Sequence, residues 1–228
     1  IAVADGSDAS RQIAQVVLLD SDFTNLPHVV MEGRKVINNV TRTAQVFFIK
    51  TIYSVLVSFF CLFSNQPFPF IPIQVTLIDA CIEAYPSFVS IVESDIRRIR
   101  GKIFCRQHFS HAAPFGITVA VMISVFSLLA PFGVEQRQTT MYMLLILISM
   151  GAVIKSCIPL TWLRTFVCVT MVGGTFFALA ILPSLFEITA ITIPMATAVL
   201  IGAAACLVAI LILEQVRKTI GKIKVECV

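Results

Sequence analysis

Charged side chains are scarce in this sequence of 228 residues. Asp, Glu, Lys and Arg together make up 13% of it, whereas a soluble domain carries about 25%. The mean hydropathy is +0.92 and 57% of the residues are hydrophobic. A globule of 25.0 kDa cannot remove so much apolar surface from water. The same numbers exclude a disordered chain, a collagen and a coiled coil, so the composition predicts a membrane protein with several spans.

Cysteine pairs are also missing. None of the seven cysteines belongs to a Cys-x-x-Cys pair, and most of them lie inside apolar stretches, where cysteine behaves as a small hydrophobic residue. Their odd number and their position argue against a disulfide framework. The net charge of +4 lies in short basic clusters between apolar runs, as in cytoplasmic membrane loops. No aromatic and basic recognition motif accompanies these clusters, so we expect the lipid bilayer as a partner and no nucleic acid.

Six apolar runs are long enough to cross a bilayer, which takes about 20 residues. They cover residues 44–63, 70–91, 113–133, 139–158, 163–183 and 192–213. Thirteen Lys and Arg residues fall in the loops and ends of one side, and only Arg137 falls in the loops of the other. Since basic loops stay in the cytoplasm, both ends of the chain are expected there, including a basic tail at 214–228.

The first 43 residues differ from the rest. Residues 1–4 and 16–19 have the pattern of short buried strands, and residues 9–15 that of a helix between them. This order predicts the edge of an α/β domain with a parallel sheet, which is too small to hold a core alone. We therefore expect residues 1–26 to be the end of a larger domain. Residues 27–43 are polar with helical spacing and predict a stalk helix; a plain juxtamembrane helix with basic headgroup anchors is the alternative.

Three ionisable side chains lie well inside the predicted spans, where each charge costs at least about 2.5–3.5 kcal/mol. They are Lys50 in the first span and Asp79 and Glu83 in the second. The spacing of Asp79 and Glu83 places both carboxylates on one helical face. Two carboxylates there suit a hard cation that prefers oxygen ligands. The alternative is a structural salt bridge with Lys50, which satisfies one carboxylate and leaves the other without a partner.

Pro86 follows Glu83 after three residues. A proline inside a helix removes a hydrogen bond and clashes with the carbonyl four residues back, here that of Ile82. Carbonyls freed in this way can become cation ligands, as in the broken helices of transporters. A simple kink is the alternative interpretation.

A polar stripe in the first span is expected to face these carboxylates. It consists of Lys50, Thr51, Ser54 and Ser58. Hydroxyl groups in a span often bond only to their own backbone, which is the alternative for Thr51 and Ser54. With Lys50, Asp79 and Glu83 all charged, the set sums to −1, which favours one bound cation over two, with Lys50 as a tethered counter-ion. A buried Lys50 could instead be neutral.

The sequence also resembles a known family. Residues 1–10 (IAVADGSDAS) and 16–23 (VVLLDSDF), followed by Glu32-Gly33-Arg34 and Asn38-Asn39, look like the end of the phosphorylation domain of P-type ATPases and its continuation into the stalk of the fifth transmembrane helix. The six apolar runs then resemble the fifth to tenth helices. The likeness is greatest to bacterial cation and calcium pumps. It implies a C-terminal fragment whose fold is a membrane all-α bundle of six transmembrane helices, preceded by a short α/β (HAD-like) remnant and a stalk helix.

The resemblance further implies site residues. Asp79, Glu83 and Pro86 match positions of the sixth helix that bind the cation, and Thr51 and Ser54 match ligand positions of the fifth helix. A two-ion calcium pump has Asn and Glu at those two positions. This chain lacks the fifth-helix carboxylate and has Lys50 beside it, so a two-calcium stoichiometry does not carry over.

The family resemblance implies an ATP-driven pump for calcium or another divalent cation in the plasma membrane. Its intact form uses Mg²⁺ and ATP and passes through an aspartyl phosphate. The motifs Asp-Lys-Thr-Gly-Thr and Gly-Asp-Gly-x-Asn-Asp do not occur in the sequence. We therefore expect this chain to lack a catalytic residue of its own, to need the N-terminal part of the same pump as a partner, and to be inactive alone. The alternatives are a six-helix secondary transporter or channel, which leaves residues 1–43 unexplained, and a truncated, non-transporting membrane protein.

Overall fold

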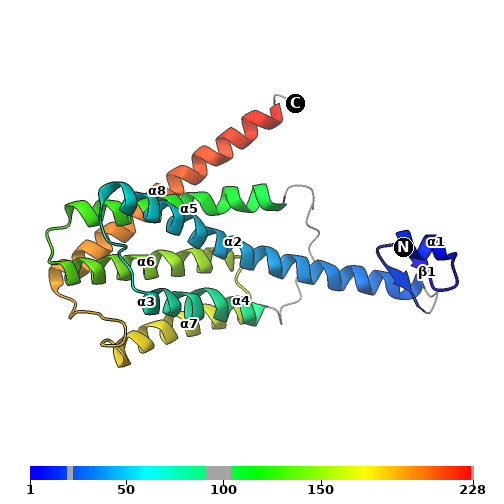
Figure 1. The fold of residues 1–228 in the computed structure, drawn as a ribbon, viewed down its shortest axis with the longest axis horizontal. Coiled ribbons are helices and arrows are strands. Elements are labelled where there is room, and N and C mark those ends of the chain that lie inside the picture. The colour runs from blue at the N-terminus through cyan, green and yellow to red at the C-terminus, as the bar shows by residue number, and fades with distance from the viewer. Residues whose placement is uncertain (20–22, 91–103, 227–228) are drawn as a thin grey trace.

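The computed structural model describes residues 1–19, 23–90 and 104–226, and within them the fold is a membrane all-α bundle (Figure 1). Among these residues, five helices are long and apolar enough to cross a membrane. They are α2 (Leu26–Ser64), α5 (Phe104–Leu129), α6 (Val134–Ser156), α7 (Trp162–Ile181) and α8 (Ile193–Glu226). Each of them overlaps one of the predicted apolar runs, although α2 begins at Leu26, well before residue 44. The basic stretch predicted between the second and third spans lies largely outside the described residues.

A small α/β unit precedes the bundle. Strands β1 (Ala2–Val3) and β2 (Val17–Leu18) pair in parallel, and α1 (Asp8–Ile13) connects them. The hydroxyl of Ser7 caps α1 by accepting a hydrogen bond from the Ser10 N–H at 3.3 Å. The predicted order of strand, helix and parallel strand is therefore present, with shorter elements than the sequence pattern indicated. After a 3₁₀ turn (Phe23–Asn25) the chain enters α2.

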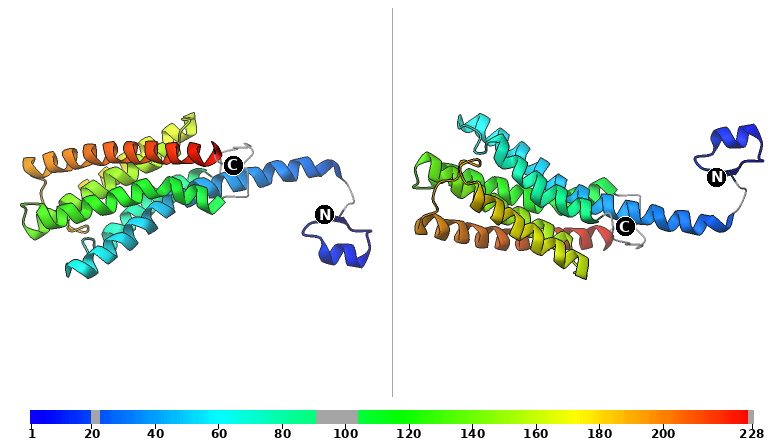
Figure 2. Two further views of the ribbon diagram at one scale, coloured as in Figure 1. Left: turned by 90° about the horizontal axis from the view of Figure 1, so that it is seen from above. Right: turned by 90° about the horizontal axis from the view of Figure 1, so that it is seen from below.

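Helix α2 runs without a break from Leu26 into the bundle. Its 39 residues correspond to about 58 Å at 1.5 Å per residue, which is nearly twice the hydrocarbon core of a bilayer. Figures 1 and 2 show its first half leaving the bundle, with the α/β unit at its far end. The apolar residues that gave the predicted stalk its helical spacing are exposed: Val29, Val30, Ile37 and Val40. The predicted stalk and first span are thus one continuous helix.

The second predicted span is not a regular α-helix. It consists of α3 (Pro72–Leu77), a π-helical segment η2 (Ile78–Ala84) and α4 (Tyr85–Ser90) in direct succession. In the wider turn of η2 the Tyr85 N–H donates to the Ala80 carbonyl, five residues back. Pro86 follows at once and has no N–H to donate. The irregular turns therefore lie just before the proline and include both Asp79 and Glu83; such π-segments occur frequently at functional sites.

Helix α6 forms the centre of the bundle. Its side chains are almost fully buried from Thr139 to Val153, with Tyr142, Leu144 and Ile146 completely enclosed. The Tyr142 hydroxyl donates to the Gln74 carbonyl at 3.1 Å, and the Gln74 amide donates to the Phe186 carbonyl at 2.9 Å. These bonds fix α3, and with it η2, against α6 and the segment before α8.

Helix α5 packs closely along α2. A Cβ atom at Gly116 would lie 2.6 Å from the Ile52 side chain, so the absence of a side chain there permits the contact. The outward faces of α7 and α8 carry large apolar side chains, among them Phe177, Leu200 and Leu211. A continuous apolar surface of this kind is expected where helices face lipid. The chain is thus a multi-pass membrane protein.

Candidate functional site

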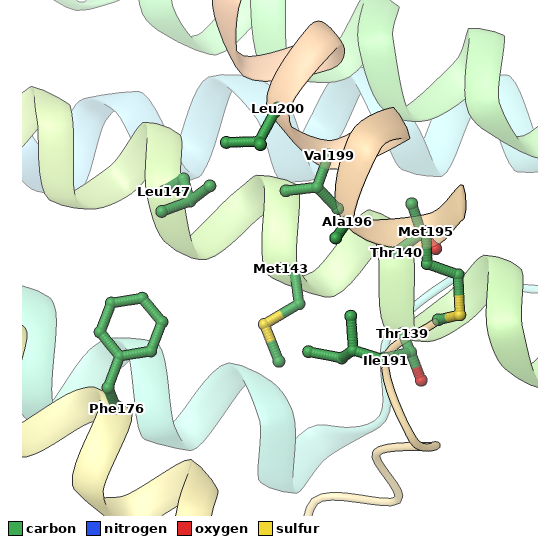
Figure 3. A pocket seen from close by; sticks show the side chains of 10 residues that line it. All are labelled: Thr139, Thr140, Met143, Leu147, Phe176, Ile191, Met195, Ala196, Val199 and Leu200. Carbon is green, nitrogen blue, oxygen red and sulfur yellow. The ribbon is translucent and has the colours of Figure 1, made fainter. Parts of the chain in front are cut away.

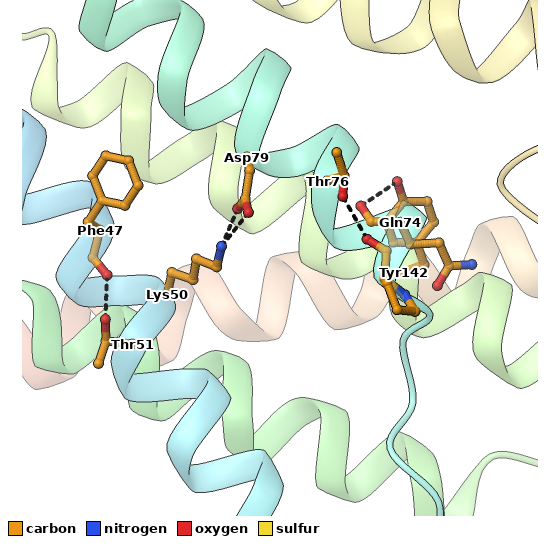
Figure 4. Close-up of polar contacts among 8 residues, drawn as sticks. Phe47, Lys50, Thr51, Gln74, Thr76, Asp79 and Tyr142 are labelled. Atoms are coloured by element: carbon orange, nitrogen blue, oxygen red, sulfur yellow. Dashed lines mark hydrogen bonds and ion pairs between the residues drawn. The ribbon is translucent and has the colours of Figure 1, made fainter.

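Lys50 and Asp79 form an ion pair inside the bundle. The Lys50 ammonium group on α2 donates to both carboxylate oxygens of Asp79 on η2 (Figure 4). The two side chains are 25% and 38% exposed, respectively. The pair connects the long helix α2 to the π-segment, and it neutralises one of the two intramembrane carboxylates.

Glu83 has different surroundings. It is only 3% exposed, and among the described residues its Oε2 atom has no hydrogen-bond partner. A buried carboxylate oxygen without a partner is costly, because the charge loses its hydration without compensation. Glu83 interacts electrostatically with Asp79 and Lys50, yet it makes no ion pair with another described residue. Of the two carboxylates, Asp79 is thus paired with Lys50, whereas Glu83 keeps one oxygen without a partner among the described residues.

A small cavity adjoins Glu83 where α2, η2, α4 and α6 meet. Its volume is about 10 Å³, close to the minimum that one water molecule requires. Nine residues line it: Thr43, Val46, Ile82, Glu83, Pro86, Ser87, Val153, Ser156 and Cys157. The Ser87 hydroxyl also donates to the Glu83 backbone carbonyl at 2.6 Å. The space beside Glu83 is at the lower limit for one water molecule, and Pro86, predicted as the helix break, is part of its wall.

The hydroxyl groups predicted on the first span are less closely associated with the carboxylates. Thr51 is exposed, donates to the Phe47 carbonyl on its own helix at 3.0 Å, and points away from Asp79 in Figure 4. The Ser58 hydroxyl donates to the Ser54 carbonyl at 2.7 Å. The structure thus brings Lys50, Asp79 and Glu83 into one neighbourhood and leaves Thr51 outside it.

Tyr53 is a member of the site that sequence reasoning missed. Its side chain is buried, its hydroxyl oxygen has no hydrogen-bond partner among the described residues, and it interacts electrostatically with Glu83 and Asp79. Tyr53 follows Lys50 after three residues, so helical spacing could have indicated it. Cys157 gave no comparable signal, because it comes from α6 and meets Glu83 only in the folded chain.

A larger cavity between α6, α7 and α8 is unsuited to a cation. It has a volume of about 240 Å³ and its lining is nearly all apolar (Figure 3). Its two hydroxyl groups are already bonded: Thr140 donates to the Gln136 carbonyl at 2.7 Å, and Thr139 pairs with Thr189 at 3.1 Å. In the described part of the chain, no three His, Cys, Asp or Glu side chains are grouped closely enough to hold a metal ion. Glu83 is therefore the candidate cation ligand whose carboxylate keeps an oxygen without a hydrogen-bond partner among the described residues.

The sequence of the chain was compared with those of known proteins. No protein-family model matches the chain. It is 37% identical, in an alignment that covers 84% of its length, to a probable cation-transporting ATPase, exp7, of Streptococcus pneumoniae. It is 36% identical over 72% of its length to the calcium-transporting ATPase CtpE of Mycobacterium bovis, and 33% identical over 82% to CtpE of Mycolicibacterium smegmatis. The matches cover 26%, 23% and 26% of these relatives, so the chain spans about a quarter of their length.

Proposed function

The chain belongs to the P-type ATPases that transport cations, and on this premise we propose that it forms the cation-binding part of the membrane domain of such a pump. In this proposal Glu83 binds one transported divalent cation, with Ca²⁺ as the first candidate. Asp79 is a second ligand that Lys50 releases when the ion enters. The observation that carries the proposal is the buried Glu83 oxygen, which has no partner among the described residues, in a residue that lines a cavity of about 10 Å³.

Charge balance supports a single ion. Lys50, Asp79 and Glu83 together carry −1 when all are ionised, so one divalent cation leaves the group at +1 and two would leave it at +3. Unbalanced charge in a medium of low dielectric constant is strongly unfavourable. The geometry also makes Lys50 a competitor of the ion, because its ammonium group occupies both oxygens of Asp79. We therefore propose that Lys50 acts as a tethered counter-ion that returns to Asp79 when the cation leaves.

The proposal extends to the intact pump. Residues 1–26 belong to its phosphorylation domain, residues 27–43 form the stalk, and the six predicted spans form part of its membrane domain. The rest of the pump supplies the phosphorylated Asp and binds ATP and Mg²⁺, so this chain alone is expected to hydrolyse no ATP. The uninterrupted course of α2 from Leu26 past Lys50 supports mechanical coupling of phosphorylation to the cation site. The proposed location is the plasma membrane with both ends in the cytoplasm.

The test measures Ca²⁺-dependent phosphoenzyme formation from ATP in the full-length protein that contains this chain. Glu83→Gln and Asp79→Asn should each abolish the dependence on Ca²⁺, because each removes a proposed ligand. Ser58→Ala is the control, since the Ser58 hydroxyl bonds only to its own helix among the contacts found. Full Ca²⁺ dependence of phosphoenzyme formation in Glu83→Gln would refute the proposal that Glu83 binds the transported cation. Transport that is insensitive to vanadate and driven by an ion gradient would refute the proposal that the chain is part of an ATP-driven pump.

A further inference from the structure

Tyr85 ends the π-helical segment that carries Asp79 and Glu83. It is the C-cap residue of η2, and its N–H donates to the Ala80 carbonyl. Its side chain reaches α7, where its hydroxyl oxygen lies 2.8 Å from that of Thr170. Both η2 and α4 pack against α7. The end of the π-segment is therefore tied to a helix that supplies none of the nine lining residues of the Glu83 cavity.

The direction of this hydrogen bond follows from the other contacts of Thr170. A hydroxyl group has a single hydrogen to donate. The Thr170 hydroxyl donates within its own helix, to the Phe166 carbonyl at 2.8 Å and the Val167 carbonyl at 3.1 Å. Its oxygen therefore acts as the acceptor toward Tyr85, and the Tyr85 hydroxyl is the donor. Tyr85→Phe would thus remove the bond and keep the aromatic ring.

Helix α7 is a firm anchor for this bond. Its first turn is capped by Thr161, whose hydroxyl accepts from the Arg164 N–H at 3.4 Å. The Arg164 guanidinium group donates to the carbonyls of Cys157 at 3.3 Å and Pro159 at 2.8 Å, in the connection from α6. The position of Thr170 is therefore set by contacts outside the π-segment.

The other end of the broken helix has a tether of its own. Gln74 in α3 is completely buried, and its amide donates to the Phe186 carbonyl at 2.9 Å. The two tethers lie on either side of Ile78–Ala84, the turns that deviate from an α-helix. A π-helical turn directs its side chains differently from an α-helical turn, because its hydrogen bonds span five residues. The directions of the two carboxylates on η2 therefore depend on how its ends are held.

We propose that Tyr85 is a positioning residue of the pump: its hydrogen bond to Thr170 holds η2 in the π-helical form, and this form directs the two carboxylates of η2 toward the transported ion. This inference rests on the proposed function, because it concerns the ligands assigned there. Tyr85 itself contacts no ion. Loss of the bond lets the segment relax toward a regular helix, so the ion binds more weakly. The binding of ATP, which the rest of the pump supplies, is unaffected.

The experiment compares Tyr85→Phe, Thr170→Val and the double variant in the purified full-length protein. It measures the half-saturating Ca²⁺ and ATP concentrations for phosphoenzyme formation and the apparent melting temperature. Each single variant should raise the half-saturating Ca²⁺ concentration about three- to tenfold and leave that of ATP unchanged. The double variant should resemble either single variant, because both remove the same bond. Thr175→Val is the matched control, since the Thr175 hydroxyl donates to the Met171 carbonyl of the same helix at 2.8 Å.

Three results would overturn the positioning role. The first is an unchanged half-saturating Ca²⁺ concentration in both single variants, even with a lower melting temperature. The second is a double variant whose increase equals the product of the two single increases, since the two side chains would then act independently. The third is an equal increase in Thr175→Val.

Glu83→Gln, measured in parallel, separates this inference from the proposed function. Loss of Ca²⁺ dependence in Glu83→Gln, with no change in the Tyr85 and Thr170 variants, would uphold the proposed function and overturn the positioning role. Full Ca²⁺ dependence in Glu83→Gln, with a shared increase in the Tyr85 and Thr170 variants, would refute the role of Glu83 and uphold the tether of η2.

Discussion

Removal of the Lys50 ammonium group is the most informative change to the proposed cation site. The ammonium group donates to both oxygens of Asp79, and it offsets one of the two negative charges of Asp79 and Glu83. Lys50→Met keeps the length and apolar character of the side chain but removes the positive charge. The group of Asp79 and Glu83 then carries −2, which one divalent cation balances fully. We therefore expect the variant to bind Ca²⁺ more tightly.

The magnitude follows from Coulomb's law and from the exposure of the pair. Two unit charges 4 Å apart interact by about 4 kcal/mol at an effective dielectric constant of 20. Because Asp79 is 38% exposed and Lys50 25% exposed, solvent screens much of this energy. We expect about a third of it to remain as the gain in Ca²⁺ binding. The resulting gain of about 1.4 kcal/mol corresponds to a tenfold lower Kd for Ca²⁺.

The assay is a Ca²⁺ titration of phosphoenzyme formation in the full-length protein, together with direct calcium binding. Lys35→Met is the matched control, because Lys35 also pairs with a carboxylate, that of Glu32, but in the first half of α2, away from the site. The control should leave the half-saturating Ca²⁺ concentration unchanged. Unchanged or weaker Ca²⁺ affinity in Lys50→Met would refute the competition between Lys50 and the ion.

Three further changes test the packing that positions the site, each measured by the apparent melting temperature of the detergent-purified protein. Gly116→Val should lower stability by about 1–3 kcal/mol through overpacking against α2, whereas Gly173→Ala, on open space, should not; equal effects would contradict the close contact. Gln74→Leu should cost about 1–3 kcal/mol, because it leaves a backbone carbonyl without its donor; no change would contradict the role of this bond. A double-mutant cycle on Lys155 and Glu214 should give a coupling below about 1 kcal/mol, because the Lys155 side chain is 42% exposed; a much larger coupling would contradict this estimate.

Hydropathy located the spanning helices because the bilayer demands about 20 apolar residues wherever a helix crosses it. The helix ends were less accurate. The run predicted at 163–183 is α7, Trp162–Ile181, since its start depends on the Thr161 cap. The boundary predicted between residues 43 and 44 does not interrupt α2, because composition changes at the membrane surface while the backbone hydrogen bonds continue.

The sequence pattern did not predict the π-helical segment. Pro86 indicated a broken helix, yet the turns that widen are those of Ile78–Ala84, before the proline. Which residues adopt the wider turn depends on how α3 and α4 are held by their neighbours. Gln74, for example, anchors α3 through a carbonyl 112 positions away. Such tertiary constraints leave no local periodicity that a sequence could reveal.

The sequence likewise predicted some residues of the candidate site and missed others. The residue types and their cost in a bilayer identified Lys50, Asp79 and Glu83, and the ion pair with Lys50 was one of two alternatives. The sequence could not show which carboxylate Lys50 would contact, because that depends on the rotation of α2 against η2. Cys157, at the end of α6, lies far along the chain, and only packing brings it to the wall of the Glu83 cavity. The ion-binding role of the site residues stays a prediction.

The account depends on Glu83 holding the transported ion. A structure of the full-length protein determined in Ca²⁺, with an anomalous or difference map, tests this directly. One ion bound to the Oε2 atom of Glu83, with the Lys50 ammonium group withdrawn from at least one oxygen of Asp79, is the predicted result. A calcium ion bound elsewhere in the membrane domain, with Lys50 still on both oxygens of Asp79 and only water beside Glu83, would contradict it.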